Sequence, residues 1–141
     1  MTGPVYLVCT DLDGSLLDHH DYNYRAAEPV LQLLEQLRIP LVLASSKTRA
    51  EILELRQALG NEHPFIAENG AATFIPERYF ASAPQGTVSR DGYYVHELAP
   101  PRATWTEPLD ALRRQLPDRF VDFATAGTAG IAAMTGLPPA Q

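Results

Sequence analysis

The sequence predicts an α/β fold, in which a mainly parallel sheet carries packed helices and a smaller α+β region follows. Short apolar runs alternate with amphipathic helical patterns over the first 67 residues. Each apolar run is followed by polar residues, and from Pro76 onward prolines separate shorter elements. Strands that alternate with helices are typical of βαβ units, whose strands are parallel.

Two strands and a helix open the chain. The run Val5–Thr10 is short and rich in β-forming residues, which predicts a buried strand. Over residues 25–37 the apolar side chains recur at the spacing of one helical face. Pro40 ends this pattern, and Leu41–Ala44 predicts a second buried strand.

The second helix carries signals at both of its ends. Thr48 and Glu51 have the spacing of a capping box, which predicts the first turn. Gly60, followed by Asn61, predicts the C-terminal stop. A third strand is expected over residues 64–67.

The remaining elements are shorter. Residues 71–75 predict a strand that Pro76 ends, residues 93–98 another strand, and residues 107–116 a short helix with Pro108 in its first turn. We expect a catalytic core over residues 1–80 and an incomplete α+β unit over residues 81–141 that covers it.

Composition excludes several classes of protein. The 141 residues contain 11 Lys+Arg and 17 Asp+Glu, a net charge of −6, which argues against nucleic-acid binding. No apolar stretch approaches the roughly 20 residues of a membrane span, and the N-terminus lacks the basic region of a signal peptide. The single cysteine, Cys9, lies in an apolar run and is expected to be a small core residue. These features predict a cytoplasmic location, no membrane partner and no nucleic-acid partner.

Chemistry is expected in three loops, because catalytic groups of parallel sheets lie at the carboxyl ends of the strands. In the first loop Asp11 and Asp13 are separated by one residue, and Gly14 allows the backbone to curl. One carboxylate can attack phosphorus and the other can transfer a proton, and both suit Mg²⁺. An ordinary acidic turn is the alternative.

The second loop, residues 45–48, precedes the capped helix. Its free amides, hydroxyl groups and Lys47 ammonium predict an anion site. Alternatively, Ser46 and Thr48 only cap the helix and Lys47 is a surface charge. Capping is the favoured interpretation for Thr48 with Glu51, whereas position favours phosphate contact for Ser45 and Lys47. His19 and His20, with the neighbouring aspartates, fit a solvated loop better than a metal site.

These motifs resemble those of a known group of enzymes. Asp11-Leu12-Asp13-Gly14-Ser15 after the first strand resembles the first motif of the haloacid dehalogenase (HAD) superfamily of phosphatases. The segments 45–51 and 64–72 resemble the mannosyl-3-phosphoglycerate phosphatase family, where related sugar phosphatases carry Thr-Gly-Arg in place of Ser45-Ser46-Lys47. The similarity is strong over residues 5–76. It implies a Rossmannoid parallel sheet with helices on both faces, incomplete in this chain, and the start of an α+β cap.

The resemblance also implies roles for individual residues. Asp11 would be the nucleophile that forms an aspartyl-phosphate, and Asp13 the general acid and base. Both would bind Mg²⁺, Asp13 through its backbone carbonyl. Phosphate or substrate contacts are assigned to Ser45, Ser46, Lys47, Arg49 and Asn69. Asn69 with its following glycine is equally an ordinary turn.

The chain departs from this family in its second half. The family has a further lysine and a GDGxxD-like acidic motif downstream, but Lys47 is the only lysine and no such acidic motif follows. We therefore interpret the sequence as the N-terminal part of a phosphatase of mannosyl-3-phosphoglycerate and expect these 141 residues alone to be inactive. The alternatives are a phosphatase of sucrose phosphate or a hexose phosphate, and a non-catalytic truncated fragment. The expected partner is a small phosphorylated sugar, and the oligomeric state is not predicted.

Overall fold

The computed structural model describes residues 6–117 and 119–135. The chain divides into two compact units, one ending at Ala99 and one beginning at Pro100. We call them the sheet unit and the helical unit. Among the described residues, no helix combines the length and the apolar character that crossing a bilayer requires.

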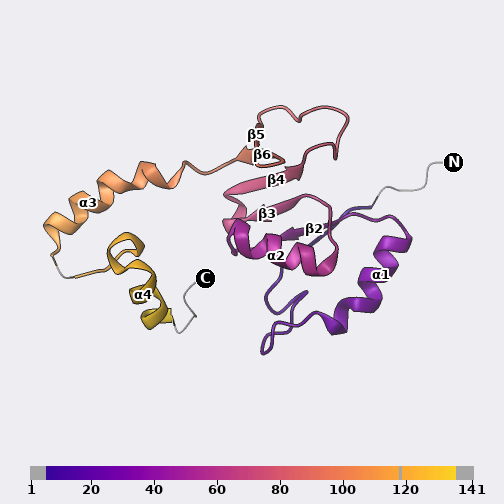
Figure 1. Ribbon diagram of the computed structural model, residues 1–141, viewed down its shortest axis with the longest axis horizontal. Coiled ribbons are helices and arrows are strands. Elements are labelled where there is room, and N and C mark those ends of the chain that lie inside the picture. Colours follow the sequence, from indigo (N-terminus) through magenta and orange to yellow (C-terminus); the bar gives the residue numbers. More distant parts are fainter. Residues whose placement is uncertain (1–5, 118, 136–141) are drawn as a thin grey trace. The chain divides into compact units, whose positions relative to one another are not determined.

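The sheet unit contains one six-stranded sheet in the order β1-β2-β3-β4-β6-β5 (Figure 1). Its strands are β1 (Val8–Thr10), β2 (Leu41–Ala44), β3 (Phe65–Ala67), β4 (Ala72–Pro76), β5 (Val88–Arg90) and β6 (Tyr93–Glu97). The first three are parallel, whereas β4, β6 and β5 pair antiparallel. The predicted α/β fold class with a parallel core is confirmed. The sheet continues through β5 and β6, and the predicted boundary between core and cap at residue 80 stays a prediction.

Two α-helices of this unit connect the parallel strands. A 3-10 turn η1 (Arg25–Ala27) leads into α1 (Glu28–Gln36), and α2 (Arg49–Leu59) follows β2. The predicted capping box of Thr48 and Glu51 is confirmed, as is the left-handed stop at Gly60, whose φ is 64°. A short 3-10 turn η2 (Glu68–Gly70) follows β3.

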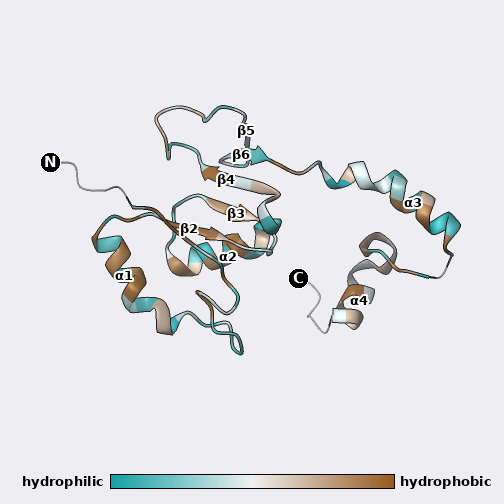
Figure 2. Cartoon of the chain, turned by 180° about the vertical axis from the view of Figure 1, so that it is seen from behind, coloured by the Kyte–Doolittle hydropathy of each residue, from teal (hydrophilic) through white to brown (hydrophobic). Residues whose placement is uncertain are grey.

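The core lies between these helices and one face of the sheet. The register places Leu43, Phe65, Phe74 and Val95 side by side on that face. Residues of α1 and α2 pack against the same cluster, as expected when two successive right-handed crossovers join adjacent strands. The resemblance implies helices on both faces of the sheet, but α1 and α2 pack against the same core cluster on one face. Figure 2 shows the apolar colouring along β2 and β3 and the mixed colouring of the amphipathic α1.

Cys9 does not belong to this core, and the prediction that it is a small core residue is wrong. It pairs in register with Val42, and the residues on either side of it pair with Leu41 and Leu43. Side chains alternate along a strand, so Cys9 points to the face opposite the helices, where it is exposed.

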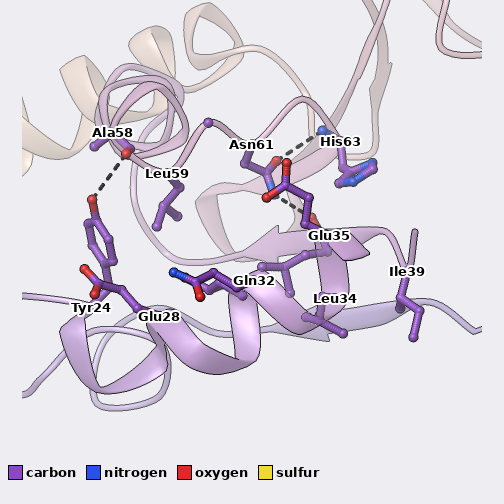
Figure 3. Close-up of a pocket in the computed structure, with 13 residues that line it drawn as sticks. Tyr24, Glu28, Gln32, Leu34, Glu35, Ile39, Ala58, Leu59, Asn61 and His63 are labelled. Atoms are coloured by element: carbon purple, nitrogen blue, oxygen red, sulfur yellow. Dashed lines mark hydrogen bonds between the residues drawn. The ribbon is translucent and has the colours of Figure 1, made fainter. Parts of the chain in front are cut away.

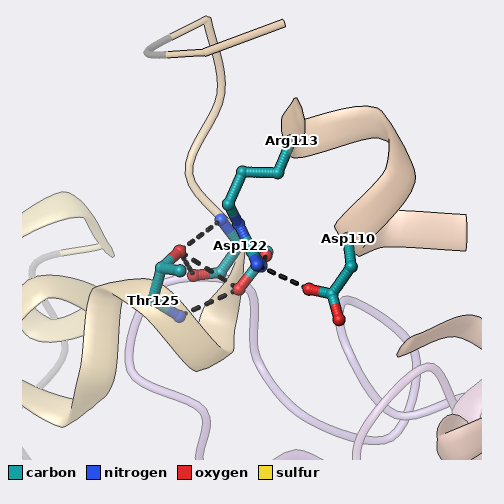
Figure 4. Close-up of polar contacts among 4 residues, drawn as sticks. All are labelled: Asp110, Arg113, Asp122 and Thr125. Atoms are coloured by element: carbon teal, nitrogen blue, oxygen red, sulfur yellow. Dashed lines mark hydrogen bonds and ion pairs between the residues drawn. The ribbon is translucent and has the colours of Figure 1, made fainter. Parts of the chain in front are cut away.

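The helical unit contains a 3-10 turn η3 (Arg102–Trp105), α3 (Thr106–Gln115) and α4 (Phe123–Thr135), which is interrupted at Gly127. Polar contacts join α3 to the start of α4 (Figure 4). Arg113 pairs with Asp110 at 2.6 Å and also with Asp122, whose carboxylate accepts the Thr125 amide at 2.9 Å. The Thr125 amide, followed by Arg113, lowers the pKa of Asp122 to about 2.

Candidate active site

The first predicted loop forms a closed turn at the end of β1. Leu12 is fully buried, and its backbone carbonyl accepts hydrogen bonds from the amides of Ser15 at 3.2 Å and Leu17 at 2.8 Å. Gly14 has a φ of 71°, a left-handed conformation that glycine adopts without strain. Because buried leucines anchor this turn, the carboxylates of Asp11 and Asp13 remain at the exposed surface beside the strand end.

The second loop leaves β2 next to the first. Thr10 pairs with Leu43 in the register, so the ends of β1 and β2 lie side by side. Ser45 is buried, with 6% of its surface exposed, and its Oγ accepts the Lys47 amide at 3.2 Å. This bond turns the chain into the N-terminus of α2.

Lys47 joins the two loops. Its Nζ lies 2.9 Å from Oδ1 of Asp13, with the two side chains 22% and 37% exposed. The hydrogen bond to Asp13 raises the pKa of Lys47, against a smaller opposing effect of burial. The structure therefore places a cation and a carboxylate at the strand ends, next to Asp11.

The third loop is tied to the second by its backbone. The amide of Glu68 donates to the Lys47 carbonyl at 3.0 Å, and that of Asn69 donates to the Ser45 carbonyl at 3.1 Å. Both Glu68 and Asn69 have positive φ, 51° and 56°. Asn69 is thus a turn residue whose amide is bonded to the second loop, and its role toward substrate stays a prediction.

Two other predicted ligands lie differently. Ser46 is exposed on the same loop. Arg49 pairs with Asp91 of the β5–β6 turn at 2.8 Å and lies over the rings of Phe74 and Tyr93, at 5.5 and 5.7 Å from their centroids. The guanidinium is therefore engaged within the sheet unit, and its role toward substrate stays a prediction.

The donors available for Mg²⁺ are the oxygens of Asp11 and Asp13. In the described part of the chain no three His, Cys, Asp or Glu side chains gather into a group that could hold a metal ion. Mg²⁺ commonly binds through one or two carboxylates and completes its octahedron with water and phosphate oxygens. The exposed carboxylates at this strand end fit such a partial site.

A cavity of about 310 Å³ lies between α1 and α2, away from the three loops (Figure 3). It is lined by Leu41, at the beginning of β2, and by Asn61 and His63, before β3. The Asn61 amide group donates to the Leu41 carbonyl at 2.9 Å. This cavity thus lies at the ends of the strands opposite the loops that carry Asp11 and Lys47, and none of the predicted site residues lines it.

Sequence reasoning did not single out Tyr22. Its ring centroid lies 5.4 Å from Nζ of Lys47. The two residues are distant in the sequence and share no motif. No signal in the sequence therefore indicated that the turn at 18–23 contacts the second loop.

The fold and these loops define an enzyme class. A model of the haloacid dehalogenase-like hydrolase family matches residues 8–84, more than half of the chain. The chain belongs to this family, which confirms the superfamily resemblance.

The similar curated proteins carry narrower names. The chain is 36% identical, over 94% of its length, to the glucosyl-3-phosphoglycerate/mannosyl-3-phosphoglycerate phosphatase of Methanococcoides burtonii, and it covers 48% of that protein. It is 48% identical over 52% of its length to the phosphatase of the same name from Persephonella marina, of which it covers 27%. The chain thus spans half or less of the length of these relatives.

Solved structures support the fold. A haloalkanoate dehalogenase-superfamily phosphatase from Bacteroides thetaiotaomicron matches 96% of this chain with a TM-score of 0.60 and 18% identity, over 48% of its own chain. A haloacid dehalogenase-like hydrolase from Bacillus subtilis matches 77% with a TM-score of 0.53 and 22% identity, over 33% of its own chain.

Proposed function

We propose that this chain supplies the nucleophile-bearing part of a Mg²⁺-dependent phosphatase that hydrolyses mannosyl-3-phosphoglycerate to mannosylglycerate and phosphate. The observation that carries the proposal is the meeting of Asp11, Asp13 and Lys47 at adjacent strand ends, in a chain related to phosphatases of glucosyl- and mannosyl-3-phosphoglycerate. The expected location of the protein is the cytoplasm, as predicted from the sequence.

The reaction runs in two displacements. A carboxylate oxygen of Asp11 attacks phosphorus, the bond from phosphorus to the leaving oxygen breaks, and Asp13 gives that oxygen its proton. Water then attacks the aspartyl-phosphate, Asp13 takes the proton of this water, and phosphate departs as the Asp11 carboxylate is restored. Ser45 and Lys47 stabilise the charge on the phosphoryl oxygens.

Lys47 has two partners in this scheme. Its ion pair matches the ionised form of Asp13, which takes the proton from water in the second step. In the first step Asp13 carries the proton that it gives to the leaving oxygen, and the phosphoryl oxygens replace its carboxylate as partners of the ammonium. Bound Mg²⁺, held by Asp11 and the Asp13 carbonyl, would reduce the repulsion between carboxylate and phosphate.

The nucleophile can be tested without turnover. Beryllium fluoride mimics a phosphoryl group on an aspartate, and ¹⁹F NMR detects its capture. We expect capture in the presence of Mg²⁺ by the complete product of the natural gene and by its Glu54→Gln variant, a change at an exposed carboxylate of α2. Asp11→Asn should abolish it. Capture by Asp11→Asn, or none by the complete product of the natural gene, would refute the role of Asp11.

The substrate is tested by phosphate release from mannosyl-3-phosphoglycerate, glucosyl-3-phosphoglycerate, sucrose phosphate and a hexose phosphate. The polypeptide assayed should be the complete product of the natural gene, and the present 141 residues should be assayed beside it. We expect the mannosyl compound to be preferred and Asp13→Asn to reduce its turnover by about 10²–10⁴-fold. Preference for sucrose phosphate or a hexose phosphate would replace the substrate assigned here.

The 141 residues alone are expected to release little phosphate, because the described part of the chain gathers only a partial metal site. Mg²⁺-dependent turnover by this chain that Asp11→Asn abolishes would contradict this expectation. Failure of the complete gene product to hydrolyse any of these compounds would favour the non-catalytic alternative.

A further inference from the structure

The turn between the first loop and α1 has a fixed backbone. The amide of Asp18 donates to the Asn23 carbonyl at 2.8 Å, and that of Tyr22 donates to the Asp18 carbonyl at 3.1 Å. The Asp18 carboxylate accepts the amide of His20 at 2.7 Å. These bonds close the turn on itself and determine where Tyr22 is presented.

Tyr22 has an unusual conformation for an aromatic residue. Its φ is 56°, in the left-handed region that residues with large side chains seldom adopt. Burial does not explain this conformation, because 57% of the residue is exposed. Strained backbone of this kind is a reason to look for a function at the side chain that it directs.

The side chain reaches the active-site cation. The ring centroid of Tyr22 lies 5.4 Å from Nζ of Lys47, within the range of a cation–π contact. The same ammonium lies 2.9 Å from Asp13. The Lys47 ammonium thus contacts both a carboxylate of the first loop and the ring of the turn.

A long lysine side chain loses considerable conformational freedom when its ammonium is fixed. One exposed ion pair compensates little of that cost, and the ring supplies a second contact that does not compete for phosphate oxygens. When the phosphoryl group draws the ammonium away from Asp13, the ring remains as a support.

We propose that Tyr22 is a positioning residue, whose ring holds the Lys47 ammonium at the strand ends where the phosphoryl group binds. The catalytic consequence rests on the proposed phosphatase function, whereas the contact itself does not. Tyr22 acts through Lys47, so its aromatic ring is required and its hydroxyl is not.

The single lysine makes a direct test possible. A chain grown with ¹³Cε-labelled lysine gives one side-chain methylene signal, which an adjacent ring shifts. We expect nuclear Overhauser contacts between this methylene and the Tyr22 ring protons. The ring-current shift should persist in Tyr22→Phe and disappear in Tyr22→Ala. Tyr6→Ala, which removes another exposed tyrosine, is the matched control and should leave the signal unchanged.

Binding gives the second readout. We expect Tyr22→Ala to weaken capture of beryllium fluoride by about two- to fivefold, the equivalent of one exposed cation–π contact, and Tyr22→Phe to restore it. The proposal is overturned if Tyr22→Ala leaves the lysine signal unchanged, if Tyr22→Phe behaves like Tyr22→Ala, or if the signal moves without any loss of capture. Absence of capture by the complete product of the natural gene would refute the proposed function instead, and the lysine signal of the 141-residue chain would still decide whether Tyr22 holds Lys47.

Discussion

The sheet unit and the helical unit are stabilised by different means. Every apolar residue that is buried in the described part of the chain belongs to the sheet unit, from Leu12 to Val95. In the helical unit most of the large apolar side chains are exposed, including Trp105 at 54% and Phe123 at 66%. Phe120 and Ile131 are half-buried. Hydrophobic burial therefore stabilises the sheet unit, whereas local polar bonds around Asp122 organise the helical unit.

The largest expected difference between the two units is in the cooperativity of unfolding, measured after they are separated. A chain of residues 1–99 should retain a cooperative urea transition by circular dichroism, because it keeps the entire described core. A peptide of residues 100–141 should show no cooperative transition, because isolated helices of 10 and 13 residues are marginal in water. A sharp transition in the peptide would contradict this comparison.

Matched leucines quantify the contrast. Leu43→Ala, at a position with no exposed surface, should lower the free energy of unfolding by about 2–5 kcal/mol, because it leaves a cavity. Leu112→Ala, at a position 41% exposed, should cost no more than about 0.5 kcal/mol. Urea titration of both variants checks this, and similar losses would show that Leu112 is also packed.

The N-termini of α2 and α3 should also differ in how much they contribute to stability. Thr48 caps α2 through the Glu51 amide, whereas no side chain caps α3 at its N-terminus. Thr48→Ala should cost about 1 kcal/mol, and Thr106→Ala, in the first turn of α3, less than about 0.5 kcal/mol. Thermal unfolding at a fixed scan rate measures both. Equal costs would mean that the capping box contributes nothing beyond helix propensity.

The smallest expected effect is a difference in pH dependence. Burial, followed by the charge of Arg56, lowers the pKa of His63 below its unfolded value of 6.5. Between the folded pKa and pH 6.5 the unfolded chain therefore binds more protons than the folded chain. The contribution of neutral His63 to stability is complete above pH 6.5 and is lost as the pH falls through the folded pKa. His63→Gln should flatten the stability profile of the sheet unit in this range.

Ionisation of Asp122 makes the stability of the helical unit depend on pH in a lower pH range. Its pKa of about 2, against 3.8 when unfolded, makes its contribution complete above pH 3.8 and removes it as the pH falls toward 2. Circular dichroism of the peptide 100–141 and its Asp122→Asn variant checks this. The comparison fails if helicity of the peptide changes between pH 6.5 and 4 as it does below pH 3.8.

Most of the sheet unit could be predicted from the sequence, because its elements carry local signals. The apolar runs gave β2 and β3, and the capping box gave α2. β5 was missed because Val88–Arg90 are all exposed and show no apolar alternation. α4 was missed because its small residues and Gly127 give little amphipathic pattern.

The candidate site could be predicted only in part. Strand ends identified the loops of Asp11, Ser45 and Lys47, since the position of a loop follows from the order of the elements. Pairing across the fold could not be predicted, because it depends on register and side-chain direction. This is why the contact of Arg49 with Asp91 and that of Tyr22 with Lys47 emerged only from the structure.

The bonds between the second and third loops have a consequence for motion. The amides of Glu68 and Asn69 are hydrogen-bonded to carbonyls of the second loop, so hydrogen exchange at either amide requires the two loops to separate. A single opening event should expose both amides, and their exchange rates should change together when an anion binds at Ser45. The loops after β2 and β3 therefore behave as one kinetic unit.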